Sequence, residues 1–179
     1  PTAAQLALIN TAAGGTITLN DVSQTFTGTA ADVSAAFSGG LAGTQTGAVT
    51  ISDTTGTIAA TTLTGITAQT DGAVGMASGG PTIEGTVAQV TAALVTVGTK
   101  VTAGAAQVSL TNDPTGAELA AINTATSGTI TLNDASQTFS GTATQLAAAF
   151  DGFGTNALSG AITIDAGTIN TTQLKTISD

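Results

Sequence analysis

Five aspartates stand where short alternating segments end, and they are the residues best placed to do chemistry: Asp21, Asp53, Asp113, Asp134 and Asp165. In each segment apolar residues alternate with Thr or Ser, a pattern that predicts a β-strand with one buried face. If such strands stack, some of the carboxylates lie about 5 Å apart, the spacing of neighbouring strands. Carboxylates at that distance repel each other, and a hard divalent cation with oxygen ligands relieves the repulsion. The pattern therefore points to calcium at these five positions.

A second interpretation of the same aspartates needs no ion. An Asp or Asn that ends a strand can close a turn with its side chain or cap the next helix, as Asp113 could do before Pro114. The glycine-rich nonapeptide of calcium-binding β-rolls and the EF-hand loop are both absent from the sequence. The expected cofactor is therefore none, or calcium, and both interpretations stay open.

The residue types that the chain lacks exclude most catalytic chemistry. The sequence has no His, Cys, Tyr, Trp or Arg, and Lys100 and Lys175 are its only cationic side chains. Most nucleophile–base pairs and all imidazole or thiolate metal sites are thus excluded. Paired carboxylates can hydrolyse glycosides, but these acids recur with a repeat and have no basic neighbour or aromatic platform for a sugar ring. We expect that the chain is not an enzyme.

The charge balance excludes a further class of partner. The 179 residues carry a net charge of -9, whereas nucleic-acid binding depends on Lys and Arg that neutralise phosphates. No apolar run approaches the roughly 18 residues that a membrane span needs. The absence of Cys is compatible with secreted and cytosolic proteins alike. Because the chain opens on Pro1 without an initiator Met or a basic signal segment, we expect a processed protein or a piece of a longer one.

An internal duplication organises the chain. Residues 1–51 align without gaps on residues 114–164, with 31 identities in 51 pairs. After a two-residue deletion the match continues, with Leu63 and Ile66 facing Leu174 and Ile177. The second copy then stops about 50 residues short of the first. We therefore predict a first repeat unit over 1–113 and a second, truncated unit over 114–179, joined in one continuous structure.

Six short helices are predicted by their start signals. A capping residue stands three positions before an acid or amide, the spacing of the capping box, in these pairs: Thr2 and Gln5, Thr29 and Asp32, Thr86 and Gln89, Thr115 and Glu118, Thr142 and Gln145, and Asn170 and Gln173. Each pair is followed by two apolar residues three or four positions apart, which gives a narrow buried stripe. Glycine-rich runs between these helices and the next strands are typical of loops.

The spacing of the strands indicates the fold class. The alternating strands begin near residues 15, 47, 73, 105, 128 and 160, about 22 to 33 residues apart, as in solenoid repeats. A strand, a helix and a second strand of one sheet should be connected in a parallel, right-handed manner. We predict a right-handed parallel β/α solenoid, β-rich with short helices and with five or six coils. The alternative is tandem β-sandwich domains, against which the six helix starts count.

One continuous core is expected along the solenoid. Its predicted members come from both copies: Leu6, Ile17, Leu19, Phe26, Val33 and Phe37, with Leu119, Ile130, Leu132, Phe139, Leu146 and Phe150. Phe153 has no counterpart in the first copy and is expected to be partly exposed.

The strings GTITLND, TFTGTAADVSAAF and GAVTISD resemble Thr/Ala/Gly-rich repeats of very long secreted bacterial proteins of the cyanobacterial type. Those proteins are surface-layer components, haemolysin-like repeat proteins and adhesins. The resemblance covers essentially the whole chain through the style of its repeats. It implies an extracellular or cell-surface location and a structural or adhesive role, often with calcium.

Two functions follow as hypotheses. In the first, the chain is a structural repeat of an extracellular filament or surface layer, and its partners are copies of itself or further repeats. In the second, it is an adhesin module that presents variable loops, Leu41 to Thr46 and Phe153 to Ser159, to glycans or to another cell. These loops differ between the copies while the scaffold is the same, as in a variable binding site. Spacer loops that drift apart would differ in the same way.

Overall fold

The computed structural model describes every residue except 78–79, 152, 154–157 and 179. The described residues form seven helices: α1 (Ala3–Ala13), α2 (Ala30–Phe37), α3 (Ala60–Thr67), α4 (Val87–Leu94), α5 (Gly116–Ala125), α6 (Ala143–Phe150) and α7 (Thr171–Ser178). They also form ten short strands: β1 (Phe26–Gly28), β2 (Val49–Ile51), β3 (Thr57–Ala59), β4 (Val74–Met76), β5 (Thr82–Gly85), β6 (Val101–Thr102), β7 (Gln107–Leu110), β8 (Ile130–Thr131), β9 (Phe139–Gly141) and β10 (Ile162–Ile164).

All strand pairs between these elements are parallel. One sheet has the order β1-β2-β4-β6, a second has the order β3-β5-β7-β8, and β9 pairs with β10. Each strand lies beside one that follows or precedes it by 22 to 27 residues, as where Phe26 faces Val49 and Val74 faces Val101. Because parallel strands need a crossover connection, the helices lie between successive strands of a sheet. The chain is thus an α/β protein with parallel sheets.

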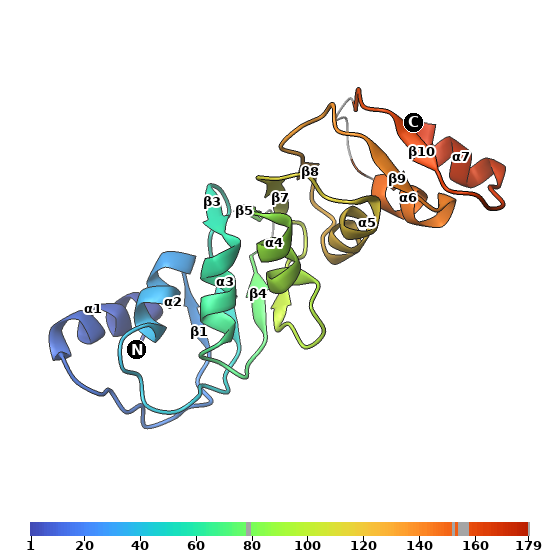
Figure 1. The fold of residues 1–179 in the computed structure, drawn as a ribbon. Helices are drawn as coiled ribbons and strands as arrows, with labels where there is room; N and C mark the ends of the chain where they lie inside the picture. Colours follow the sequence, from blue (N-terminus) through green and yellow to red (C-terminus); the bar gives the residue numbers. More distant parts are fainter. Residues whose placement is uncertain (78–79, 152, 154–157, 179) are drawn as a thin grey trace.

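The helices follow one another in space in the order of the sequence. Each helix from α1 to α6 contacts the next one, and Figure 1 shows them in a row along an elongated molecule whose two termini lie at opposite ends. We call a stretch of chain that ends with one of the helices α2 to α7 a coil. Among the described residues, no helix is both long and apolar enough to cross a membrane.

The helix starts form as their side chains dictate. Four have the full reciprocal capping box, including Thr2 with Gln5 and Thr115 with Glu118. Asn170 and Gln173 exchange the same pair of hydrogen bonds at the start of α7, and Thr29 caps α2 through the amide of Asp32. The predictions for all six helices are therefore confirmed. The seventh, α3, has Ala59 as its N-cap residue and therefore no side-chain cap, so the search for caps missed it.

The core is a thin line of small and medium side chains that runs through all the coils. Eight of the twelve predicted core residues are buried, and Ile17, Leu19, Leu132 and Phe150 are partly buried against them. The prediction for Phe153 is wrong, because its ring is only 4% exposed and packs edge-on against Phe150 at a centroid distance of 5.9 Å. The Phe153 ring thus extends the second copy's aromatic cluster.

The strand predicted from Thr16 to Asp21 is much shorter in the structure. Ile17 forms a single parallel bridge with Leu41, and no ladder extends from it. The equivalent Ile130, 113 residues later, belongs to β8 and pairs with Val108 in β7. A strand is defined by its neighbours, so the same local sequence gives a ladder only where another coil lies beside it.

Candidate functional site

The first group of predicted site residues, Asp21 and Asp134, closes tight turns. Oδ1 of Asp21 accepts hydrogen bonds from the amide of Ser23 at 2.8 Å and from its hydroxyl at 2.6 Å. Asp134 accepts the same two bonds from Ser136, at 2.7 and 2.6 Å. The hydroxyl bond, followed by the amide bond, lowers the pKa of each carboxyl below its ordinary value. These two aspartates thus form Asx turns.

Asp53 caps a helix that precedes it in the chain. Its Oδ2 accepts a hydrogen bond of 2.7 Å from the amide of Ala30, the first residue of α2. Asn112 does the same for α4, where its Oδ1 accepts from the amide of Val87 at 2.7 Å. Free amides and the positive end of the helix dipole both favour an oxygen acceptor there. The side chain that ends one strand therefore joins its own coil to the previous helix.

Asp113 and Asp165 have different surroundings from Asp53. Asp113 is exposed, and Thr115, not Asp113, caps α5. Asp165 is also exposed. It directly follows Ile164, which faces Gly141, whereas Asp53 stands two residues after Ile51, which faces Gly28. Asp165 is therefore one residue nearer to its strand than Asp53 is. In the described part of the chain, no three acidic side chains form a group that could hold a metal ion. The five aspartates are thus divided among different local roles.

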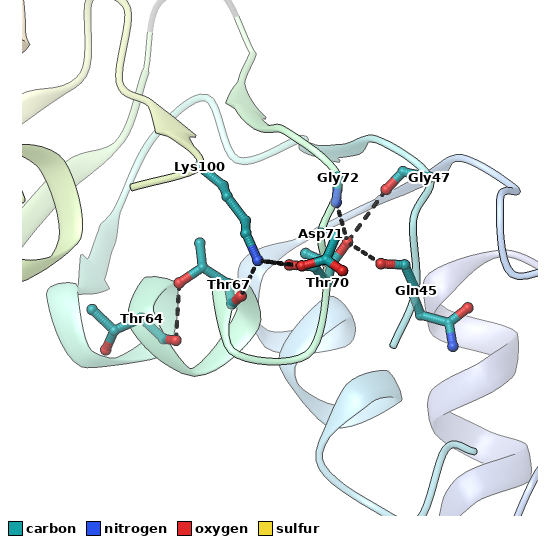
Figure 2. A network of polar contacts seen from close by, with 8 residues as sticks. All are labelled: Gln45, Gly47, Thr64, Thr67, Thr70, Asp71, Gly72 and Lys100. Atoms are coloured by element: carbon teal, nitrogen blue, oxygen red, sulfur yellow. Dashed lines mark hydrogen bonds and ion pairs between the residues drawn. The ribbon is translucent and has the colours of Figure 1, made fainter. Parts of the chain in front are cut away.

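A polar network around Lys100 joins three coils, those that end with α3, α4 and α5, and Figure 2 shows its members. The Lys100 ammonium donates to the carbonyl of Thr67 at 3.2 Å and to that of Thr70, and it pairs with Asp71 Oδ1 at 3.0 Å. Thr67 is the last residue of α3, where a cation satisfies free carbonyls and favours the helix dipole. The ion pair is half exposed, so it contributes little to stability by itself. The ammonium acts mainly as a cap that ties α3 to the coil of β6.

Thr70 forms a second contact between coils in the same network (Figure 2). Its hydroxyl lies 3.1 Å from the carbonyl of Gln45 and accepts from the amide of Gly72 at 2.9 Å. Thr126 repeats this arrangement. Its hydroxyl donates to the carbonyl of Ala106 and accepts from the amide of Gly128 at 3.0 Å. We call this arrangement of Thr and Gly a clamp. Sequence reasoning missed it, although a Thr-x-Gly motif whose glycine stands two residues before a strand could have indicated it.

The glycine of each clamp is required by a close approach of two backbones. A Cβ at Gly72 would lie 1.9 Å from the carbonyl oxygen of Gly47, and one at Gly128 would lie 2.2 Å from that of Ala106. Gly47 and Gly160 stand at comparable approaches to earlier coils. Contacts below about 3.0 Å are not tolerated by a Cβ. The coil junctions are therefore closed by backbone against backbone.

Two asparagines at the same repeat position hold neighbouring helices together. Nδ2 of Asn10 in α1 donates to the carbonyl of Ala35 in α2 at 3.0 Å. Nδ2 of Asn123 in α5 donates to the carbonyls of Ala148 at 3.0 Å and Asp151 at 2.6 Å, at the end of α6. Sequence reasoning missed both residues. The signal was an Asn, a poor helix former, inside a predicted helix of both copies.

The polar side chains described above bind backbone groups of neighbouring coils or close local turns. Among them, the hydroxyls of Ser23 and Ser136 each donate to a carboxylate within a tight turn, and the acids are bound singly. The arrangement is suited to holding successive coils in register. Comparison of the chain with protein-family models, with curated proteins and with solved structures finds no significant match.

Proposed function

We propose that the chain is a stretch of a right-handed solenoid that serves as a structural repeat of an extracellular filament or surface layer and assembles by stacking coils. The observation that carries this proposal is the regular parallel pairing of strands 22 to 27 residues apart, with consecutive helices in contact. In such a repeat architecture each coil is stabilised mainly by its neighbours. Further coils can therefore be added at an end without a new kind of contact.

The chemistry of the chain supports a structural role. Contacts that both copies repeat, such as the Asn10 and Asn123 bonds, join neighbouring helices. The largest part of the sequence is Thr, Ala and Gly, and the chain has only two cationic side chains. The extracellular location rests on the resemblance of the repeats to those of secreted bacterial proteins.

The alternative of an adhesin module that presents variable loops to glycans has weaker support. Leu41 bridges Ile17, and Gln45 pairs with Thr70 and is fully buried. The exposed residues of the first predicted binding loop are therefore only Gly43, Thr44 and Thr46. The second loop includes residues 154–157, which lie outside the described residues.

Electron microscopy of the purified protein over a concentration series tests the structural role. We expect uniform thin fibres or sheets, with a diffraction spacing of about 4.7–4.9 Å along the stacking direction from the parallel strands. A glycan array under the same conditions tests the alternative. Separate particles at every concentration, with specific glycan binding, would contradict the structural role and favour the adhesin.

A further inference from the structure

The first repeat unit exposes residues that the second unit buries. Ile9 in α1 and Ile122 in α5 occupy the same repeat position, yet Ile9 is 48% exposed and Ile122 is fully buried. The difference arises from the neighbours, because α5 contacts α4, whereas α1 has α2 as its main helical neighbour. The contact between α4 and α5 thus shows that a preceding coil covers this position.

Two more matched positions describe the same surface. Gly128 lies so close to the preceding coil that a Cβ would be 2.2 Å from a carbonyl oxygen, but at Gly15 the nearest atom is 3.9 Å away. Ile130 is fully buried and pairs with Val108, whereas the equivalent Ile17 is half-buried and pairs with Leu41 alone within the described residues. Gly15 and Ile17 thus have the geometry of a coil junction with one side uncovered.

The other end of the described chain exposes the complementary side. Leu63 in α3 is fully buried, and its repeat equivalent Leu174 in α7 is 52% exposed. Ile66 is 1% exposed beneath the next coil, whereas the equivalent Ile177 lines a partly polar hollow of about 310 Å³ with Phe150 and Phe153. Ile169, equivalent to the buried Ile58, is likewise only half-buried.

We propose that these two surfaces bind each other between copies of this chain. The head (Ile9, Gly15 and Ile17) of one copy stacks on the tail (Ile169, Leu174 and Ile177) of another. This inference rests on the proposed function and specifies its interface. A second copy is the occupant because the two surfaces are the two halves of one kind of junction, which the chain already forms internally between α3 and α4 and between α4 and α5. Both surfaces are made of apolar side chains and glycine.

The register of the contact follows from the second sheet. Its strands align Ile58, Ile83, Val108 and Ile130 in one continuous row. Ile169 is the repeat equivalent of Ile58, and Ile17 is that of Ile130. The row therefore continues when Ile17 of the second copy lies opposite Ile169 of the first. Such a head-to-tail contact joins two different surfaces, so it generates an open filament when its rotation does not close.

Point variants at the two ends test the contact while sparing the fold. Gly15→Ala adds a Cβ with no atom closer than 3.9 Å in one copy, but it would collide with the backbone of a stacked neighbour. Leu174→Ser removes an exposed apolar contact at the tail. Each should weaken association by about tenfold or more, the effect of losing one well-buried apolar contact. Light scattering over a concentration series measures the change, and thermal melts confirm folding.

Matched controls separate the ends from the rest of the surface. Gly65→Ala adds a Cβ to α3 with no atom within 4 Å, and Val97→Ser changes a fully exposed apolar side chain between the ends. Both should assemble like the unmodified chain. Ile9→Ser provides a second variant of the head if Gly15→Ala fails to fold.

Mixing the two end variants tests the polarity of the contact. Gly15→Ala keeps an intact tail and Leu174→Ser keeps an intact head, so a mixture should stop at dimers while each variant alone stays monomeric. Dimers of Leu174→Ser alone would show a head-to-head contact and overturn the proposal. If the unmodified chain assembles and the end variants assemble equally well, this interface is wrong and the proposed function stands. A strictly monomeric unmodified chain at high concentration would contradict both.

Discussion

The rings of Phe26 and Phe37 meet edge to face, with their centroids 5.3 Å apart and their planes at 89°. The second copy repeats the pair with Phe139 and Phe150, at 5.3 Å and 90°. Phe26 is 1% exposed and Phe139 is 2% exposed, so each ring joins the first residue of a strand to the end of the next helix. Phe26 and Phe139 are the largest fully buried side chains among the described residues, in a core that otherwise consists mainly of Ala, Val, Leu and Ile.

Replacing Phe26 with Ala should therefore lower the free energy of unfolding by about 3–5 kcal/mol, because the substitution leaves a cavity that a thin core cannot close. Phe139→Ala should have a similar effect. Denaturant titration followed by circular dichroism measures the change, and Val97→Ala at a fully exposed position is the control. A loss below about 1 kcal/mol at Phe26 would show that the ring is not part of the core.

The paired glycines give a prediction with an internal control. Gly128→Ala should destabilise the chain by about 1–3 kcal/mol, because its Cβ meets a backbone carbonyl of the preceding coil. Gly15→Ala, at the same repeat position, should change the stability of a single copy by at most about 0.5 kcal/mol. Equal effects at the two positions in denaturant titrations of dilute protein would contradict the close approach at Gly128.

The carboxylate of Asp53 should stabilise α2 as a cap. Asp53→Ala removes the acceptor for the Ala30 amide and should cost about 0.5–2 kcal/mol. Asp53→Asn keeps an acceptor, as Asn112 does for α4, and should retain most of the stability. Thermal melts of both variants at pH 7 make the comparison. A full loss in Asp53→Asn would indicate that the charge, and not the hydrogen bond, is what matters.

The turn at Asp21 should make its carboxyl titrate below the ordinary range. The Ser23 hydroxyl lowers the pKa of Asp21, so Ser23→Ala should raise this pKa toward its usual value of about 3.9. Because the folded-state pKa is lowered, the contribution to stability is present above about pH 4 and is lost as the pH falls through the folded pKa. Carboxyl NMR titration measures the shift. Asp134, bound to Ser136, is the internal reference and should not change.

Removal of calcium should leave the melting temperature unchanged. The carboxylates of Asp21, Asp53 and Asp134 are engaged by amides and hydroxyls in the structure, so we expect that folding does not depend on an ion at these positions. Melting curves with a chelator, with added calcium and with added magnesium test this expectation. A fall with the chelator that calcium alone reverses would establish calcium binding to the folded state.

Much of the local structure could be predicted because its causes are local. Thr2 and Gln5 are three residues apart, and that spacing alone brings the Thr2 hydroxyl and the Gln5 side-chain amide to free backbone N–H groups of the first helix turn. The apolar stripe of each helix and the alternation along each strand are equally short-range, so Phe26, Val33 and Leu119 could be assigned to the core. Helix α3 escaped prediction because Ala59 offers no capping side chain, and its stability comes from burial of Leu63 and Ile66.

The partners of each residue were decided only by the tertiary structure. Asp21 and Asp53 both follow alternating segments, yet one closes a turn and the other caps a helix about 23 residues earlier, because the register of the strands places different groups beside them. Ile9 and Ile122 show the same limit most directly. Their local sequences are nearly identical, but the burial of each side chain depends on the coil packed against it. That coil is specified by backbone pairing and not by any residue near either isoleucine.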